Sequence, residues 1–412
     1  MNKYQLNFQE IKNSAFNLSK ISEEKRNNFL ENLSVIILQH QEMIMQANRK
    51  DVSIAKKNGL SSSFIERLAL DELDIKKIVI KLQEIKKLES GIGKVIEEKT
   101  QADGLWIRKV AVPLGVIAVI YEARPEVTID VAALCVKSGN AAILKGGSEA
   151  LNTNKTLYKC IVGALEKSGL NNDTVSFISA RGSVNSLLGQ KTYVDLVIAR
   201  GGYELVKDVM NKTTIPVLAH ASGGARIYVD KSANVSLAQQ IIINAKISKP
   251  SACNSLDTIV VHKGIASKFI PKIVRELKAN KVEVIGDEIS CRLADISGAS
   301  KSDWDTEFLS LKVAIKVVDD INEAIEFINK HSKKHSEGII ALKQKIIDYF
   351  VSSIDAAAIF VNCSTRLHDG YVFGLGSEIG IATGKLHARG PVGIGELTTY
   401  KWEVHGNGQV RE

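Results

Sequence analysis

The chain has 412 residues, of which 45% are hydrophobic and 24% are charged, so it suits two or three globular domains with sizeable cores. A net charge of +8 is a mild excess, which alone selects neither an acidic substrate nor nucleic acid as the ligand. No stretch approaches the roughly 18 apolar residues of a membrane span. Residues 1–16 also lack the apolar core of a signal peptide, so we expect a cytoplasmic protein.

Residues 5 to about 50 are predicted to be helical. Ser22 suits a helix N-cap, and Glu23 and Glu24 follow in the first turn, where the helix dipole favours carboxylates. A second helical region follows Gly59. It carries apolar residues at helical spacing among lysines, namely Ile75, Ile78, Leu82 and Ile85. We expect these helices to serve packing and assembly.

From about residue 104, apolar runs of strand length alternate with helical segments. The first run, 105–112, is a predicted strand that ends at Pro113. The later runs are Val116–Tyr121, Pro125–Ser138, Ala141–Lys145, Glu149–Lys167, Val175–Ser179, Val184–Gln190, Val194–Ala199, Tyr203–Met210 and Ile215–Leu218. Strands rich in Val and Ile, each followed by a helix, indicate a parallel sheet covered on both faces. Such sheets bind ligands at the carboxyl ends of their strands.

Two glycine pairs stand at such strand ends, in Lys145-Gly146-Gly147 and in Arg200-Gly201-Gly202. Each pair precedes a helix, whose first N–H groups and dipole can hold a phosphate. The usual Rossmann spacing GxGxxG is absent. A tight strand-to-helix turn explains each pair equally well.

A second α/β block follows a break near 221–224. Its predicted strands are 225–229, 257–262, 282–285, 313–318, 338–341 and 357–361, and its predicted helices are about 234–246, 265–279, 320–330 and 344–353. The last fifty or so residues are rich in glycine and basic residues, which is typical of ligand-facing loops or of a structural closing segment.

Cys253 is one of five scattered cysteines, an odd number without CxxC spacing, which predicts reduced thiols and no zinc site. It lies on a loop before the apolar run 259–261, a position that suits a covalent nucleophile, although free cysteines are also commonly buried. Lys246 and Lys249 could stabilise its thiolate or be ordinary surface lysines. We expect Cys135 and Cys160 to be core residues.

His331 and His335 have the i, i+4 spacing of a helical metal pair. No carboxylate lies between them, and the intervening Ser-Lys-Lys is unfavourable for a cation. We interpret them as a solvated helix end and predict no metal site.

Four long stretches together carry a resemblance to the gamma-glutamyl phosphate reductases, also called glutamate-5-semialdehyde dehydrogenases, of the aldehyde dehydrogenase superfamily. The stretches are 112–147, 249–261, 361–380 and 385–402. The resemblance implies an α/β fold with two doubly wound parallel-sheet domains plus a small β-flap for oligomerisation. The implied parts are a cofactor-binding domain at 1–223 with a flap at about 104–113, a catalytic domain at 224–385, and a C-terminal segment at 386–412 that returns to the cofactor domain and the flap.

The family's activity implies NADPH-dependent reduction of L-glutamyl 5-phosphate to L-glutamate 5-semialdehyde, with release of phosphate, in proline biosynthesis. Cys253 would then be the nucleophile, since a thiolate can displace phosphate to form a thioester that accepts hydride. A homo-oligomer and a separate glutamate 5-kinase are the implied partners, with no nucleic acid and no membrane. The alternatives are a hydrolytic NAD(P)-dependent semialdehyde dehydrogenase and a non-catalytic basic binding protein on the same fold.

The resemblance also suggests residue roles. Lys145, with Gly146, matches the lysine that reaches the adenosine ribose, where a positive charge suits the 2′-phosphate of NADP. Arg200, Gly201 and Gly202 would lie by the pyrophosphate. Glu307 matches the glutamate that holds the nicotinamide ribose, with a solvated helix-edge carboxylate as the alternative. The candidates for binding the carboxylate and phosphate of the substrate are Arg124, Arg366 and Arg389, each of which could instead form a structural ion pair.

Several positions depart from the superfamily or family pattern. Ala221 stands where hydrolytic members carry the glutamate that activates water, so water attack on a thioester is not promoted. Residues 122–125 replace the motif of the oxyanion asparagine, which leaves backbone N–H groups near Cys253, with Asn254, as the expected oxyanion donors. Glu126 and Arg226 replace a common asparagine and a common histidine.

Overall fold

The computed structural model describes residues 6–179, 183–219 and 222–411, which form two compact units. Unit 1 comprises the described parts of 1–221 together with 374–380 and 391–412, and unit 2 comprises 222–373 and 381–390. The division after residue 221 lies two residues before the expected boundary. The C-terminal part differs more from expectation, because the chain joins unit 1 at 374–380, returns to unit 2, and joins unit 1 again from 391.

Unit 1 is built on a five-stranded parallel sheet in the order β5-β4-β3-β6-β7. The strands are β3 (Val116–Tyr121), β4 (Ala141–Gly146), β5 (Val175–Phe177), β6 (Leu196–Arg200) and β7 (Val217–Ala219). The chain order along this sheet reverses between β3 and β6. In open parallel sheets, that switch point is where ligands bind, at the carboxyl ends of the two strands.

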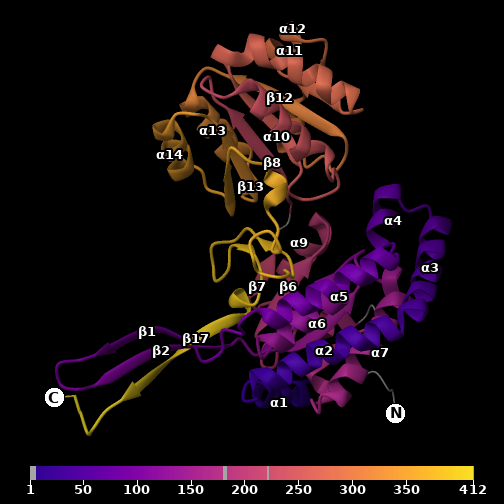
Figure 1. Cartoon of the computed structure of the whole chain (residues 1–412), viewed down its shortest axis with the longest axis vertical. Coiled ribbons are helices and arrows are strands. Elements are labelled where there is room, and N and C mark those ends of the chain that lie inside the picture. Colours follow the sequence, from indigo (N-terminus) through magenta and orange to yellow (C-terminus); the bar gives the residue numbers. More distant parts are fainter. Residues whose placement is uncertain (1–5, 180–182, 220–221, 412) are drawn as a thin grey trace. The chain divides into compact units, whose positions relative to one another are not determined.

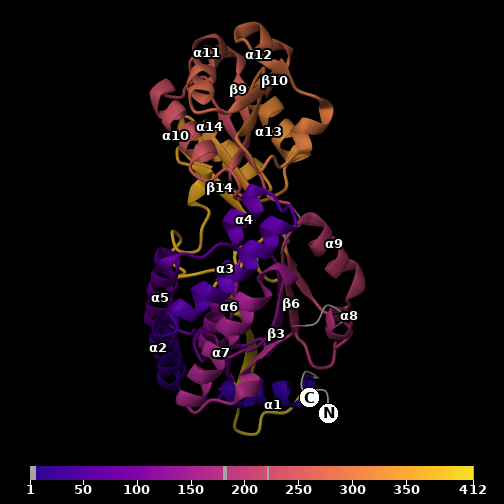
Figure 2. The same cartoon turned by 90° about the vertical axis from the view of Figure 1, so that its right-hand side faces the viewer.

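Helices cover both faces of this sheet (Figure 2). The helices of unit 1 are α1 (Phe8–Leu18), α2 (Glu23–Gln39), α3 (Gln41–Lys57), α4 (Ser62–Leu68), α5 (Glu72–Lys87), α6 (Val127–Lys137), α7 (Leu151–Lys167), α8 (Ser183–Leu188) and α9 (Tyr203–Lys212). One face packs against α1, α8 and α9, and the other against α6 and α7, which α2 and α5 cover in turn. The Ser22 hydroxyl accepts from the Lys25 N–H, which confirms the predicted cap.

An antiparallel flap extends from the body of unit 1 (Figure 1). Its strands are β1 (Val95–Thr100), β2 (Trp106–Pro113) and β17 (Thr398–His405), with β2 in the centre. The sequence predicted β2 but missed β1, because five of its six side chains are exposed and its sequence VIEEKT has no apolar alternation.

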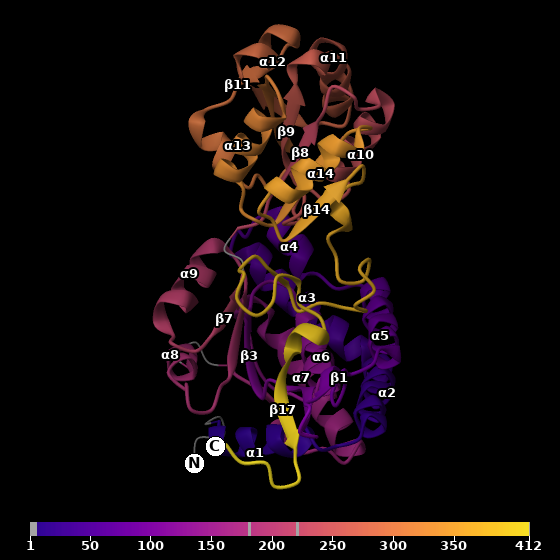
Figure 3. The same ribbon diagram turned by 90° about the vertical axis from the view of Figure 1, so that its left-hand side faces the viewer.

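Unit 2 is built on a seven-stranded parallel sheet in the order β11-β10-β12-β9-β8-β13-β14 (Figure 3). The strands are β8 (Ala225–Val229), β9 (Leu256–His262), β10 (Glu283–Gly286), β11 (Ser297–Gly298), β12 (Lys312–Val318), β13 (Ser336–Ile340) and β14 (Ala358–Val361). The helices are α10 (Val235–Ile247), α11 (Lys263–Ala279), α12 (Glu288–Leu293), α13 (Ile321–His331) and α14 (Gln344–Ser353). Two-residue strands β15 (Ile381–Ala382) and β16 (Gly390–Pro391) lie in the glycine-rich C-terminal stretch.

The central strands of unit 2 are buried on both faces, which explains their continuous Val and Ile content. Alternate side chains of β9 point to opposite cores: Ile259 and Val261 pack with α10 and α11, and Val260 packs with α13 and α14. The predicted α/β architecture with two covered parallel sheets is therefore confirmed. None of the described helices is long and apolar enough to cross a membrane.

Candidate active site

Cys253 lies in a tight turn between α10 and β9, at the amino end of the sheet of unit 2. The turn is closed by hydrogen bonds from the Ala252 N–H to the Lys249 carbonyl (3.1 Å) and from the Ser255 N–H to the Ala252 carbonyl (3.0 Å). The Cys253 side chain is partly exposed. The thiol therefore stands at the edge opposite to the one where a parallel sheet usually binds its ligand.

The other two cysteines assigned to the core by sequence are indeed buried. Cys135 lies within α6 and Cys160 within α7. Burial raises the pKa of the Cys135 thiol, and it raises the pKa of Cys160 to about 11. Neither thiol is suited to act as a nucleophile near neutral pH.

Gly223 and Gly224 immediately precede β8, and their backbone packs directly against the cysteine turn. The Gly224 N–H donates to the Cys253 carbonyl oxygen over 2.6 Å. A Cβ atom at position 223 would lie 2.5 Å from the Cys253 Cβ and 2.7 Å from the Glu307 Oε1. Those separations exclude any side chain at residue 223, so Cys253 and Glu307 flank the same bare stretch of backbone.

Glu307 lies in the loop before β12. Its Oε2 accepts from the Ser222 hydroxyl over 3.2 Å, and its side chain is partly buried. Glu307 comes two residues after a short 3₁₀ helix (Lys301–Asp305), so the alternative of a carboxylate at a helix edge stays open. Its carboxylate also lies close to the candidate nucleophile across Gly223.

Arg366 brings a cation to the cysteine turn from the loop after β14. Its Nε donates to the Ser248 hydroxyl over 3.2 Å, and its Nη1 donates to the Asn254 Oδ1. Burial lowers the pKa of Arg366, and the adjacent Cys253 acts in the opposite direction. A guanidinium in that position favours the thiolate form of the cysteine.

Asn254 connects the cysteine turn to the Arg366 loop. Its Nδ2 donates to the His368 carbonyl over 3.0 Å, and its own carbonyl accepts from the Thr365 hydroxyl over 2.8 Å. The residue is buried. These bonds fix the two loops to one another, and the suggested role of Asn254 as an oxyanion donor stays a prediction.

Lys246 is not a surface lysine. Its side chain is fully buried, and its Nζ donates to the Leu256 carbonyl (2.8 Å) and lies 3.8 Å from the Asp257 Oδ1. Burial lowers the pKa of Lys246 to about 8 and raises that of Asp257 to about 6. The ammonium is therefore engaged beneath the cysteine turn, with a carboxylate of β9 as its partner.

Arg226 is also buried, with 1% of its side chain exposed. Its backbone N–H donates to the Glu337 Oε2 (3.0 Å), its Nη1 to the Glu337 Oε1 (3.4 Å) and its Nη2 to the Trp304 carbonyl (3.2 Å). Burial raises the pKa of Glu337 to about 7, against the opposing effect of Arg226. This departure from the family pattern is thus a structural ion pair within unit 2.

The glycine pairs of unit 1 lie at the carboxyl ends of β4 and β6, as the sequence predicts. The Gly202 N–H, at the start of α9, donates to the Glu122 Oε2 over 3.0 Å, so this strand end already holds an anionic group. The Arg200 Nη1 is buried and makes no hydrogen bond. These groups fit a dinucleotide pyrophosphate, provided that the Glu122 carboxylate moves aside.

Lys145 is buried at the end of β4, where its Nζ donates to the Gly146 carbonyl over 2.7 Å. Arg124 follows the end of β3, after Ala123, which has a φ of 55°. Glu126 is the residue that precedes α6. Lys145 and the predicted substrate residue Arg124 thus lie at the carboxyl edge of the sheet of unit 1, whereas the predicted cofactor residue Glu307 belongs to unit 2, and their roles stay predictions.

Arg389 lies in unit 2, where its Nη1 is 2.8 Å from the Asp355 Oδ1. Lys334 and Lys385 each lie 3.2 Å from Oδ2 of the same carboxylate. These cations hold the pKa of Asp355 well below its usual range. The ion pair is the structural alternative foreseen for Arg389, although its Nε and Nη2 are buried without hydrogen bonds.

The two histidines of the sequence pair have different environments. His331 ends α13 and lies 2.9 Å from Asp305, whereas His335 is fully buried and contacts the Ser336 hydroxyl at 2.9 Å. The interpretation as one solvated helix end was wrong for His335, which precedes β13 and faces the interior. Within 6–179, 183–219 and 222–411, no three His, Cys, Asp or Glu side chains are grouped to hold a metal.

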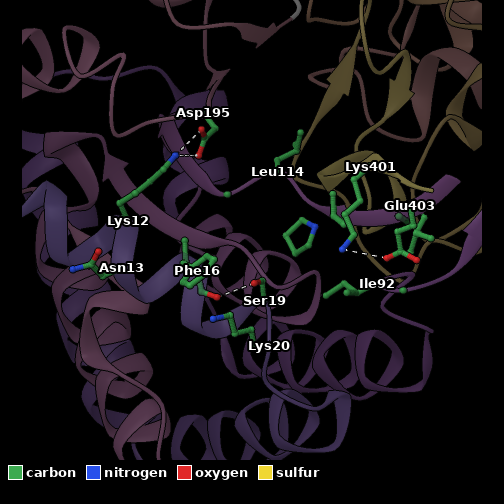
Figure 4. Close-up of a pocket in the computed structure, with 17 residues that line it drawn as sticks. Lys12, Asn13, Phe16, Ser19, Lys20, Ile92, Leu114, Asp195, Lys401 and Glu403 are labelled. Atoms are coloured by element: carbon green, nitrogen blue, oxygen red, sulfur yellow. Dashed lines mark hydrogen bonds and ion pairs between the residues drawn. The ribbon is translucent and has the colours of Figure 1, made fainter. Parts of the chain in front are cut away.

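A cavity of about 780 Å³ lies at the root of the flap in unit 1, between α1, β2 and β17 (Figure 4). Four of its charged groups form two ion pairs, Lys12 with Asp195 at 2.7 Å and Lys401 with Glu403 at 3.2 Å, and the Lys20 Nζ lies over the Phe16 ring. None of the predicted site residues lines it. The candidate active site is therefore located by the side chains around Cys253, and this cavity is not part of it.

Comparisons with known proteins assign this chain to a family. The model of the aldehyde dehydrogenase family matches residues 7–290. The gamma-glutamyl phosphate reductase of Petrotoga mobilis is 44% identical over 98% of this chain and 97% of its own, and that of Caldanaerobacter subterraneus is 42% identical over 98% of both chains. The crystal structure of the Thermotoga maritima gamma-glutamyl phosphate reductase superposes with a TM-score of 0.94, at 41% identity, over 98% of this chain and 99% of that one.

The chain belongs to the gamma-glutamyl phosphate reductases, within the aldehyde dehydrogenase family. An acetylating aldehyde dehydrogenase from Geobacillus thermoglucosidasius, at 19% identity and a TM-score of 0.72, shares the fold. The resemblance carried by the four long stretches is thereby confirmed. As in any gamma-glutamyl phosphate reductase, the cofactor is expected to be a nicotinamide dinucleotide.

Sequence reasoning missed three features of this reductase's site. It gave no role to Gly223, although that glycine precedes a strand in a presumed ligand-binding region. It read Asp257 only as part of a strand, and it did not connect Glu337 with Arg226, which lies 111 residues earlier. A charged residue within an otherwise apolar strand, as in LDTIVV, is the pattern that could have drawn attention to Asp257.

Replacing Gly223 by alanine should lower turnover by at least about 100-fold, since displacement of reacting groups by about 1 Å can have that effect. The added Cβ would collide with Cys253 and Glu307. Steady-state kinetics measure the loss. Gly298→Ala is the matched control, because a Cβ there would meet nothing within 4 Å. Near-normal turnover of Gly223→Ala would contradict the close approach.

Proposed function

We propose that this protein reduces L-glutamyl 5-phosphate to L-glutamate 5-semialdehyde, with NADPH as the reductant and release of phosphate, as a step of proline biosynthesis. The observation that carries the proposal is the partly exposed Cys253 thiol, held in a tight turn with Arg366 and Glu307 beside it. The relatives at 42–44% identity bear the name of this activity.

The chemistry follows from a thiolate with a cation beside it. The Cys253 sulfur attacks the acyl carbon, the bond from that carbon to the phosphate oxygen breaks, and inorganic phosphate leaves. NADPH, held by Lys145, Arg200 and Glu307, would supply the hydride to the carbonyl carbon of the resulting thioester. The carbon–sulfur bond then breaks, which regenerates the thiolate and releases the aldehyde. Arg366 can stabilise the thiolate before attack and again after product release.

Water is the competing nucleophile for the thioester. The superfamily position of the water-activating glutamate corresponds to Ala221, which lies outside the described residues. An alanine supplies no base, so phosphate rather than water is the partner of the thioester in the reverse reaction.

In the reverse direction, the purified protein should form NADPH from NADP⁺ and glutamate semialdehyde only when inorganic phosphate is present. Omitting phosphate should slow NADPH formation by at least about 100-fold, which is the lower range of what a missing general base removes from water attack. Absorbance of NADPH measures the rate, and Cys253→Ala should be inactive with or without phosphate.

Equal turnover without phosphate would contradict the proposal and favour a hydrolytic semialdehyde dehydrogenase. A protein that is inactive in both conditions but binds nucleic acid in a salt-sensitive manner would instead be a basic binding protein.

For the cofactor, we assign Lys145, Gly146, Arg200, Gly201 and Gly202 to the phosphates and the adenosine ribose, and Glu307 to the nicotinamide ribose. The support is the buried ammonium of Lys145 at the end of β4 and the buried, unbonded Nη1 of Arg200 at the end of β6. A positive charge at Lys145 favours NADP over NAD.

Lys145→Ala should lower the ratio of kcat/KM for NADPH to that for NADH by about tenfold, the size of one lost charge-assisted hydrogen bond. The ratio isolates the 2′-phosphate, since both cofactors share every other group. An unchanged ratio, with both values reduced equally, would show that Lys145 does not read the 2′-phosphate.

We further propose that copies of the chain associate through the flap. Strand β17 forms one edge of the flap and exposes a row of large side chains, with Tyr400 and Trp402 each 50% exposed and Val404 57% exposed. An open edge strand with such a row is a site where another chain pairs.

Light scattering of the wild-type protein should give a mass of at least two chains, and Tyr400→Ser/Trp402→Ser should shift it toward one chain. Leu342→Ser, at an apolar side chain of unit 2 that is 67% exposed, is the control and should leave the mass unchanged. A wild-type monomer would contradict the proposal.

A further inference from the structure

The carboxylate of Asp257 lies beneath the cysteine turn, two residues into β9, and is 2% exposed. Its Oδ1 accepts the Phe308 N–H over 3.2 Å. A Cβ at Gly224, whose φ is +123°, would lie 2.7 Å from the Asp257 Oδ2. The same Gly224 donates its N–H to the Cys253 carbonyl. One buried carboxylate thus contacts both loops that flank the candidate nucleophile.

The loop that carries Glu307 is held at two points by buried charges. The Asp257 carboxylate binds the Phe308 N–H on one side of Glu307, and the Arg226 guanidinium binds the Trp304 carbonyl on the other. Directly after Phe308, Leu309 has a φ of 50°, a left-handed conformation that a branched side chain rarely adopts. Such a conformation persists where surrounding contacts impose it.

Two buried ion pairs lie next to the loop that carries Glu307. Lys246 lies 3.8 Å from Asp257, Arg226 lies 3.4 Å from Glu337, and the Arg226 charge also acts on Asp257. All four side chains are at most 3% exposed. Burying paired charges gives little net stability, so a role in fixing one conformation is a reason to retain them.

We propose that Asp257 is a positioning residue that fixes Glu307 against Cys253 through the Phe308 N–H, and so sets the binding of the nicotinamide ribose. This inference rests on the proposed role of Glu307 in holding the cofactor. Asp257 acts through the loop backbone, by accepting the Phe308 N–H next to Glu307.

Asp257→Ala should raise both the KM and the equilibrium dissociation constant for NADPH by about tenfold, since Glu307 loses its backbone anchor. The kcat at saturating NADPH should fall less than this. Asp257→Asn should restore NADPH binding to within about threefold of wild type, because the amide oxygen still accepts the Phe308 N–H. Fluorescence titration of NADPH measures binding without turnover.

The matched control is Asp230→Ala, at a carboxylate of unit 2 that is also 2% exposed but follows the carboxyl end of β8. It accepts from the Tyr228 hydroxyl and from Ser232, so its loss should reduce thermal stability without changing NADPH binding. A similar rise in the dissociation constant for Asp230→Ala would show that the effect of Asp257→Ala is general destabilisation, and would overturn the proposal.

Glu307→Gln separates this proposal from the one on which it rests. If Glu307→Gln leaves NADPH binding unchanged, the cofactor role of Glu307 fails. If it weakens binding while Asp257→Ala does not, only the positioning role fails. In the supported case, Asp257→Ala adds less than about twofold to the loss already caused by Glu307→Gln, because the two residues act as one unit.

Discussion

The close approach of two backbone segments is the constraint on which the rest of the site depends. The Gly224 N–H donates to the Cys253 carbonyl over 2.6 Å, and no Cβ fits at Gly223 between Cys253 and Glu307. This contact places the thiol at the amino end of β9 and brings the Glu307 loop to the same point. The charged side chains of Glu307 and Arg366 lie around that contact.

Two kinds of charge surround the contact. On the cysteine turn, Arg366 binds Asn254 and interacts electrostatically with Cys253, where a cation favours the reactive thiolate. Next to it, two ion pairs are buried in unit 2, Lys246 with Asp257 and Arg226 with Glu337. The Arg366 guanidinium is placed to stabilise the thiolate, and the two buried ion pairs are placed to hold the loops in position. We propose that phosphate discharges a thioester formed here, since Ala221 stands where the resemblance places the water-activating glutamate of hydrolytic relatives.

Much of the fold follows from local sequence, because runs such as Ile259-Val260-Val261 need cover on both faces and therefore predict parallel strands between helices. Cys253 and Arg366 could be proposed from motifs. The environments of Lys246 and His335 could not, since burial depends on partners that only the tertiary structure supplies. From sequence, Arg226 was only a departure from the family pattern, because its partner Glu337 lies 111 residues later. Strand β1 was missed because its side chains face solvent.

In the proposed reaction, Cys253 carries the acyl group, and phosphate rather than water discharges it. Intact-protein and peptide mass spectrometry after mixing with glutamate semialdehyde and NADP⁺, in phosphate-free buffer, tests it directly. One glutamyl adduct per chain should appear on the peptide that contains Cys253, stable until phosphate is added and then lost. An adduct on another cysteine, or loss of the adduct at the same rate without phosphate, would contradict it.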